Sequence, residues 1–300
     1  MGHATRSSML IDLLLAENCE LTIYSDGMSY NLLKKRYPEV EIINGAELSI
    51  NYSKLNVFFH LKLLFQLQNW KKKDAERFRS AVGFREFDVL INDARYSILP
   101  DFVSVKKSIL VNHQLRPIWP FGKVLAQTAL DAWMQAYDEI WVPDDEKLNL
   151  TGRLSKNDDF IDRVYFIGFL SQFHDLDLPE IQKGQSINLL SGPNKERQKI
   201  KDNTNSVGEF GNEEYDKVKL LNKLSVEKIY CHSGYSSLMD ALYLGRKPII
   251  KATKGQSEQE YLYQRSMKLD LAYSKELEGN EFIAKPYFNQ IISQKIKELC

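Results

Sequence analysis

The stretches that decide the fold are residues 87–93, Phe-Asp-Val-Leu-Ile-Asn-Asp, and residues 107–114, Lys-Ser-Ile-Leu-Val-Asn-His-Gln. Each is a short run rich in aliphatic residues that ends in polar side chains, which is typical of a buried strand followed by a loop. Helical patterns lie around residues 55–82 and 122–136. Strands that alternate with helices in this way predict a parallel sheet covered by helices, an α/β fold.

The same alternation extends to both ends of the chain. Toward the N-terminus the patterns predict a helix, a strand, a helix and a strand over residues 7–17, 20–24, 29–36 and 40–43. Toward the C-terminus they predict strands at residues 139–142, 163–167, 186–190, 227–231 and 247–250. The polar stretch 199–214 is predicted to be a loop with at most one short strand, at Val207. We therefore expect two α/β units in tandem, joined near residues 168–179.

Composition agrees with a globular chain of about two domains. The 300 residues correspond to roughly 150 per domain. Forty basic and forty acidic residues give a net charge of +0, so no global field attracts nucleic acid or an anionic membrane. The chain has no apolar run of 18 residues, and its opening residues lack the pattern of a signal peptide.

The cysteines predict neither a zinc site nor a disulfide framework. Cys19, Cys231 and Cys300 are odd in number, far apart and without CxxC spacing. A reducing cytoplasm is the compartment that this usage favours.

The segment 55–70 allows two interpretations. It is rich in aromatic and aliphatic residues and is followed by Lys71-Lys72-Lys73, as a helix at a membrane interface would be. Its polar residues are scattered around the helix, however, which favours a buried core helix.

Polar clusters follow four of the predicted strands, and ligands of parallel sheets bind at these carboxyl ends. The clusters are residues 92–95, 112–114, 191–193 and 232–237. The last two combine a strand, a glycine-containing loop and a helix, an arrangement that suits a diphosphate, although a tight turn alone would explain each. Asp240 either binds a ligand or caps the start of a helix. Gln256, Gln259 and Glu260 either hydrogen-bond the hydroxyl groups of a sugar or form a solvated helix start.

His3 and His113 are predicted to lie in loops that face the same edge of the first unit. An imidazole, whose ordinary pKa is about 6.5, accepts a proton from an attacking hydroxyl near pH 7. Asp93 does the same if burial raises its pKa. The sequence contains no HExxH or GxxxxGK[ST] motif, so it does not support a zinc-protease or P-loop function.

Eight of these segments, in this order, resemble bacterial glycosyltransferases of the GT-B architecture, close to the MurG-like glycosyltransferase family 28. The segments Ser233–Asp240 (SGYSSLMD) and Gly255–Tyr261 (GQSEQEY) are the most specific. The other six are residues 2–6 (GHATR), 92–96, 112–115, 141–144, 165–168 and 190–193.

The resemblance implies two Rossmann-like domains that face each other across a cleft. Residues 1–168 would bind the acceptor, residues 169–285 a nucleotide-sugar that is usually UDP-linked, and a helix in 286–300 would pack back on the first domain. Ser191, Gly192, Ser233, Gly234, Tyr235 and Ser236 would cradle the diphosphate. Asp240 would bind the ribose, and Gln256, Gln259 and Glu260 the donor sugar. His3, Asp93 and His113 are the candidate catalytic bases.

The implied reaction is a metal-independent, inverting transfer to a hydroxyl of a lipid-linked or glycan acceptor, with no cofactor and no nucleic acid. The implied location is the cytoplasm or the inner face of the membrane, with peripheral contact at most. Two alternatives stay open: a sugar-nucleotide epimerase, and an inactive protein that binds nucleotide-sugars.

The family pattern has a strand before Gly2, and this sequence has none there. The first strand of a doubly wound sheet is central, so its absence should leave neighbouring strands unpaired. We expect that either the native chain starts upstream or another segment fills the slot. The sequence also departs from the family at His232, where an arginine is usual, and in the short segment 197–215.

Overall fold

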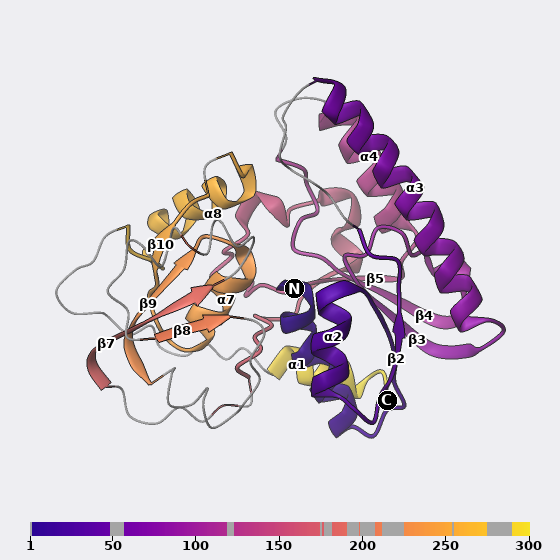
Figure 1. The fold of residues 1–300 in the computed structure, drawn as a ribbon, viewed down its shortest axis with the longest axis horizontal. Helices are drawn as coiled ribbons and strands as arrows, with labels where there is room; N and C mark the ends of the chain where they lie inside the picture. The colour runs from indigo at the N-terminus through magenta and orange to yellow at the C-terminus, as the bar shows by residue number, and fades with distance from the viewer. Residues whose placement is uncertain are drawn as a thin grey trace.

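The computed structural model describes residues 2–48, 57–118, 123–174, 176, 182–190, 198, 208–211, 225–253, 255–274 and 290–300. It contains two α/β units, which lie side by side in Figure 1. We call the part with helices α1 to α4 and strands β1 to β6 the first unit. The part with strands β7 to β10 and helices α7 and α8 is the second unit.

The main sheet of the first unit is parallel and has the strand order β3-β4-β5-β6. Its strands are β3 (Glu86–Asp93), β4 (Ser104–Val111), β5 (Glu139–Val142) and β6 (Val164–Phe166). In register, Ile91 lies opposite Ile109 and Val111 opposite Trp141. Ile109, Val111 and Trp141 are 0% exposed, because parallel strands are covered on both faces. The predicted strands are therefore confirmed.

Helices α3 (Val57–Val82) and α4 (Lys123–Gln135) belong to this unit, as do the 3-10 turns Pro100–Phe102, Gly152–Leu154 and Asp158–Arg163. The sequence allowed a core helix or an interfacial helix for residues 55–70. Most of the side chains that distinguish the two lie outside the described part of the chain.

A second, two-stranded sheet of the first unit stands apart from the main one. It pairs β1 (Thr22–Ser25) in parallel with β2 (Glu41–Asn44), and helix α2 (Gly27–Arg36) connects them. Among the described strands, neither β1 nor β2 pairs with β3. Within the described strands, β1 and β3 each have one strand partner, as expected for neighbours that do not pair with each other.

The second unit is a parallel sheet in the order β10-β9-β7-β8. Its elements are β7 (Gln182–Leu190), β8 (Gly208–Gly211), β9 (Val226–His232), α7 (Tyr235–Tyr243), β10 (Ile249–Lys251) and α8 (Ser257–Lys268). Ile187, Ile229 and Leu238 form part of its core. Leu150 and Leu154, from the loop after β5, are buried in the same core, so this loop links the two units.

Helix α1 (Gly2–Ala16) begins earlier than predicted. The Gly-His pair was expected in a loop, with the helix starting at Ser7. The structure shows that expectation to be wrong, because His3 and Arg6 lie in the first turns of the helix and contact Asp93. A contact between residues so far apart in sequence outweighs the low helix propensity of one N-terminal glycine.

Helix α9 (Gln290–Lys297) packs on the first unit, where Ile292 and Ile296 are buried against Met9 of α1. A disulfide joins Cys19, just after α1, to Cys300, and Cys231 is a buried free thiol. The prediction that the cysteines form no disulfide was therefore wrong. The two residues are 281 apart in sequence, and only the return of α9 to α1 brings them together. The cysteines no longer favour a reducing compartment, because disulfides persist mainly in oxidising ones.

We expect Cys300→Ser to lower the Tm by about 5 °C or more, since removing a native disulfide typically costs about 2–5 kcal/mol. Thermal unfolding followed by circular dichroism, with and without dithiothreitol, measures this effect. The reductant should lower the Tm of the wild type to that of Cys300→Ser and leave the variant unchanged. A wild-type Tm that does not respond to reductant would contradict the assignment.

Candidate functional site

Three side chains of helix α1 converge on one carboxylate, Asp93, at the carboxyl end of β3. His3, Arg6 and Ser7 lie three and four residues apart and so share a helix face. The His3 Nδ1 atom is 3.1 Å from Asp93 Oδ1, and Ser7 Oγ donates to Asp93 Oδ2 over 2.5 Å. Arg6 Nε lies 3.1 Å from both carboxylate oxygens, and its Nη2 contacts Asp93 Oδ1.

Arg6 fixes the charge of Asp93. The Arg6 side chain is 2% exposed and the Asp93 side chain 14% exposed. Burial raises the pKa of Asp93, but the charge of Arg6 and the hydrogen bonds from Arg6 and His3 lower it further, so the net shift is far downward. Asp93 is therefore a stable carboxylate that accepts hydrogen bonds and binds a proton weakly.

This charge state favours one tautomer of His3. An ionised carboxylate can only accept hydrogen bonds, so the short contact with His3 Nδ1 is favourable when that nitrogen carries the proton. Arg6 Nη2 can only donate and lies 3.0 Å from the same nitrogen, and this contact favours the other tautomer; one of its two N–H groups is engaged by Asp93. With the proton on Nδ1, the imidazole keeps a lone pair on Nε2, on a side chain that is 56% exposed.

His113 connects this cluster to the second unit. Arg6 Nη1 donates to His113 Nδ1 over 3.2 Å, and His113 Nε2 donates to Glu258 Oε1 of α8 over 3.0 Å. The ring of Tyr235 stacks on the imidazole, with centroids 4.1 Å apart. Burial lowers the pKa of His113 more than Glu258 raises it, which favours the neutral ring. Both ring nitrogens are engaged inside the protein.

The start of helix α7 lies beside this cluster. Gly234 is its N-cap, so the backbone N–H groups at Tyr235 and Ser236 lie in the first turn of the helix. Tyr235 is 3% exposed, and its hydroxyl donates to the carbonyl of Pro143. Burial raises the pKa of Tyr235 well above its ordinary value, which keeps the hydroxyl neutral. The side chain of Tyr235 therefore has a packing role, and its backbone forms part of the first turn of α7.

Asp240 lies deeper than a ligand contact would require. It is 7% exposed, and it accepts hydrogen bonds from Ser171 Oγ over 2.6 Å and Gln172 Nε2 over 2.8 Å. Burial raises its pKa to about 6, against the lowering effect of these two bonds. Both carboxylate oxygens are thus occupied by residues that follow β6, and a ribose hydroxyl would have to compete with them.

The residues predicted to bind the donor sugar, Gln256, Gln259 and Glu260, lie at the start of α8. Gln259 Oε1 accepts from the N–H of Thr253, and its carbonyl accepts from Ser233 Oγ. Glu260 Oε1 accepts from the N–H of Gly255, and Gln256 is the N-cap residue. The structure therefore brings Ser233 and Gln259 together, across the ends of β9 and β10. Ser191 and Gly192 lie outside the described residues.

Sequence reasoning missed two members of the cluster, Arg6 and Glu258. The spacing of His3, Arg6 and Ser7 on one helix face could have indicated Arg6, had the helix been predicted to start at Gly2. Glu258 carries no such signal, because its partner is 145 residues away. Burial raises the pKa of Glu258, but His113 lowers it further.

In the described part of the chain, no group of three or more His, Cys, Asp or Glu side chains is arranged to hold a metal ion. Within the same residues, no helix combines the length and apolar character needed to cross a membrane.

Solved structures that are similar to this chain in fold include glycosyltransferases. The chain matches the glycotransferase of kitacinnamycin with a TM-score of 0.57 at 11% identity, over 99% of this chain and 91% of that one. It matches Arabidopsis thaliana UGT89C1 complexed with UDP-L-rhamnose with a TM-score of 0.57 at 11% identity, over 98% and 87% of the two chains. SnogD from Streptomyces nogalater gives a TM-score of 0.53 at 8% identity, over 99% and 96%.

The chain has the GT-B fold. At these identities the likeness concerns the fold alone. No protein-family model and no curated protein matches the sequence. The GT-B fold is also the one that the eight sequence segments implied.

The buried carboxyl of Asp240 predicts a distinct pH dependence. The folded chain holds this proton up to about pH 6, whereas an unfolded Asp releases it near 3.8. The folded state binds more protons between these values, so the contribution of Asp240 to stability falls as the pH rises through them. We expect the stability of Asp240→Asn relative to wild type to increase from pH 4 to pH 7 in urea unfolding.

Asp158 provides the matched control, because its side chain is 90% exposed. The pH dependence measured for Asp158→Asn is the reference with which that of Asp240→Asn is compared. Parallel pH curves for Asp240→Asn and wild type would show that the pKa of Asp240 is the same in the folded and the unfolded chain.

Proposed function

We propose that the chain is a glycosyltransferase that moves a sugar from a nucleotide-sugar, UDP-linked, to an acceptor hydroxyl with inversion and without a metal. The observation that carries this is the pairing of an exposed His3 imidazole with the buried Asp93–Arg6 pair, beside the N-terminus of α7. A base for the acceptor and a site for the leaving diphosphate thus lie together. The GT-B fold and the solved neighbours support the reaction class.

In the proposed step, His3 Nε2 takes the proton from the acceptor hydroxyl as the oxygen attacks the anomeric carbon. The bond from that carbon to the diphosphate oxygen breaks, and the electron pair leaves with the nucleoside diphosphate. Asp93 accepts from Nδ1 and stabilises the imidazolium that forms, as carboxylates do for catalytic histidines. Asp93 is thus a positioning residue rather than a second base, and His113 holds Arg6.

The leaving diphosphate would be stabilised by the helix start at Ser233, Gly234, Tyr235 and Ser236. Backbone N–H groups and the helix dipole favour an anion there, which is a fixed electrostatic contribution to the transition state. We place the donor sugar at Gln256, Gln259 and Glu260 and the diphosphate also at Ser191 and Gly192. A ribose contact of Asp240 would require a hydroxyl group to compete with the hydrogen bonds from Ser171 and Gln172.

The acceptor would enter from the first unit. A cleft of about 1890 Å³ is lined near His3 and Asp93 by Tyr96 and Trp133. The rings of Tyr96 and Trp133 lie 4.3 Å apart, and Tyr96 is 44% exposed. An exposed aromatic pair beside a base suits an acceptor with an apolar or sugar face. In this proposal residues 1–168 bind the acceptor and 169–285 the donor, as in the family-28 resemblance.

We expect His3→Gln to lower kcat for transfer from a UDP-sugar by about 100-fold or more, which is the usual contribution of a general base. The dissociation constant for UDP, measured by titration calorimetry, should change less than threefold, because the base acts on the acceptor. Asp93→Asn should lower kcat as well, since Asn cannot stabilise the imidazolium.

His174→Gln is the matched control, because His174 contacts Asp12 and the carbonyl of Ser171 rather than Asp93. It should keep wild-type turnover. Transfer that is unchanged in His3→Gln would remove His3 from the mechanism. Binding of UDP without transfer to any acceptor would favour an inactive binding protein, and conversion of the donor sugar without an acceptor would favour an epimerase.

A further inference from the structure

Tyr96 lines the cleft that also contains His3 and Asp93, and it is 44% exposed. Within the described part of the chain, the Tyr96 hydroxyl makes no hydrogen bond, and none contributes to its pKa. The hydroxyls of Tyr137 and Tyr235, by contrast, donate to backbone carbonyls. A polar group that the protein leaves without a partner in a cleft is a group that a ligand can bind.

The electrostatic field at the Tyr96 hydroxyl comes from both units. Burial raises the pKa of Tyr96, the charge of Glu258 in α8 raises it further, and the charge of Arg6 in α1 lowers it. The hydroxyl is therefore neutral near pH 7, so it can both donate and accept a hydrogen bond. Arg6 is already paired with Asp93, and Glu258 with His113. The Tyr96 hydroxyl thus lies where the two units meet, beside charges that are already matched.

The ring of Tyr96 rests on a fixed support. Its centroid lies 4.3 Å from that of Trp133 in α4, and the two ring planes are inclined at 34°. Trp133 is 6% exposed, and its Nε1 donates to the carbonyl of Ile98 over 3.4 Å. Because Trp133 is buried and bonded, the exposed part of the Tyr96 ring is the aromatic surface that a ligand in the cleft would meet.

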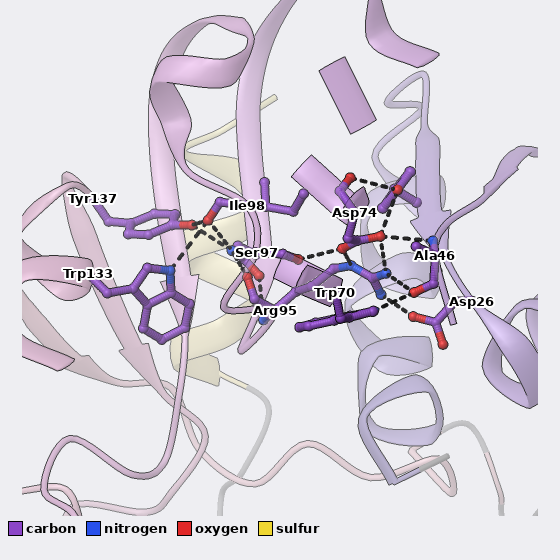
Figure 2. A network of polar contacts seen from close by, with 11 residues as sticks. Asp26, Ala46, Trp70, Asp74, Arg95, Ser97, Ile98, Trp133 and Tyr137 are labelled. Atoms are coloured by element: carbon purple, nitrogen blue, oxygen red, sulfur yellow. Dashed lines mark hydrogen bonds and ion pairs between the residues drawn. The ribbon is translucent and has the colours of Figure 1, made fainter. Parts of the chain in front are cut away.

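The loop that carries Tyr96 is anchored by the polar network in Figure 2. Arg95 donates to Asp74 of α3 over 2.7 and 2.8 Å and to Asp26 over 2.6 Å. Asp74 is 0% exposed. On the side of β3, Asn92 donates to the carbonyl of Arg95 over 3.1 Å and accepts from its N–H over 2.8 Å. The residue before Tyr96 is therefore held through both its side chain and its backbone.

The backbone between these anchors has an unusual conformation. Ala94 has a φ of 51°, in the left-handed region that residues with a Cβ atom rarely adopt. Such a conformation persists only where its surroundings determine it, and Asn92 and Arg95 provide those surroundings here. The turn fixes the spacing between Asp93 and Tyr96. A ligand bound to Tyr96 would therefore meet a surface that is already ordered, which lowers the entropic cost of binding.

A sugar ring matches Tyr96 better than an alkyl chain does. The C–H face of a pyranose packs on an aromatic ring, and the hydroxyl groups at its edge donate and accept hydrogen bonds. An alkyl chain would cover the ring but would leave the Tyr96 hydroxyl desolvated and without a partner, which is unfavourable. The loop after β4 and helix α4 line the cleft with uncharged residues: Gln114, Pro117, Ala126, Ala129, Leu130 and Trp133.

We propose that Tyr96 determines acceptor specificity and that the acceptor presents an uncharged pyranose ring to it. This inference rests on the proposed transfer reaction and names the chemical class of its acceptor. The C–H face of the pyranose packs on the ring of Tyr96, and one of its hydroxyl groups pairs with the phenol hydroxyl. A second hydroxyl group of the same acceptor is then the one that His3 deprotonates.

The test measures binding by NMR on the 15N-labelled full chain, without a nucleotide-sugar. The probes are the methyl α-pyranosides of glucose, galactose and mannose, with hexanol as an alkyl probe and glucuronate as a charged ring. The indole N–H signal of Trp133, assigned by its loss in Trp133→Phe, reports on the support of the Tyr96 ring. Dissociation constants come from the shift of this signal during each titration.

At least one methyl pyranoside should shift the Trp133 signal along a saturating curve, and hexanol and glucuronate should bind at least tenfold more weakly. Tyr96→Phe should weaken binding of that pyranoside by about three- to tenfold, because one hydrogen bond is lost. Tyr96→Ala should weaken it further, because the ring is lost as well. Tyr30→Phe is the matched control, since Tyr30 packs against the core beside α2, and it should keep the wild-type affinity.

The absence of a saturable shift with all three methyl pyranosides would overturn the inference. So would equal affinity of the wild type and Tyr96→Phe, or tighter binding of hexanol or glucuronate than of every pyranoside. These readouts need no turnover, so their failure leaves the proposed role of His3 standing. Transfer from a UDP-sugar that is unchanged in His3→Gln would refute that role and leave pyranoside binding at Tyr96 as measured.

Discussion

The buried guanidinium of Arg6 is the charge around which the site is organised. A charge taken out of water must be paired, and breaking a buried pair by removing one partner typically costs about 3–5 kcal/mol. Arg6 meets this requirement through Asp93 on one side and His113 on the other. Because Asp93 ends β3 and His113 contacts Glu258 of α8, the chain of contacts joins α1, the main sheet and the second unit.

The same chain of contacts accounts for the electrostatics at the site. The N-termini of α1 and α7 carry positive potential, and Arg6 adds a full charge between them. Two carboxylates, Asp93 and Glu258, hold that charge in balance, and both have pKa values lowered by their basic partners. A diphosphate arriving at α7 would meet an arranged set of N–H groups with little reorganisation, which is how fixed dipoles stabilise developing charge.

Much of the fold could be predicted from the sequence, because strands of both parallel sheets contain buried apolar residues, such as Ile109, Val111 and Ile229. What could not be predicted depends on contacts between residues far apart. The helical start at Gly2 depends on Asp93, the disulfide on the return of α9, and the burial of Asp240 on Ser171 and Gln172.

The central claim is that an ionised Asp93 holds the His3 ring with its proton on Nδ1 and a bare, basic Nε2. Long-range proton–nitrogen NMR of the 15N-labelled protein near pH 7.5 reads the tautomer directly, with His3 assigned by the signals lost in His3→Gln. The account predicts a protonated-type shift for Nδ1 and an unprotonated-type shift for Nε2. The reverse pattern, with the proton on Nε2, would contradict it.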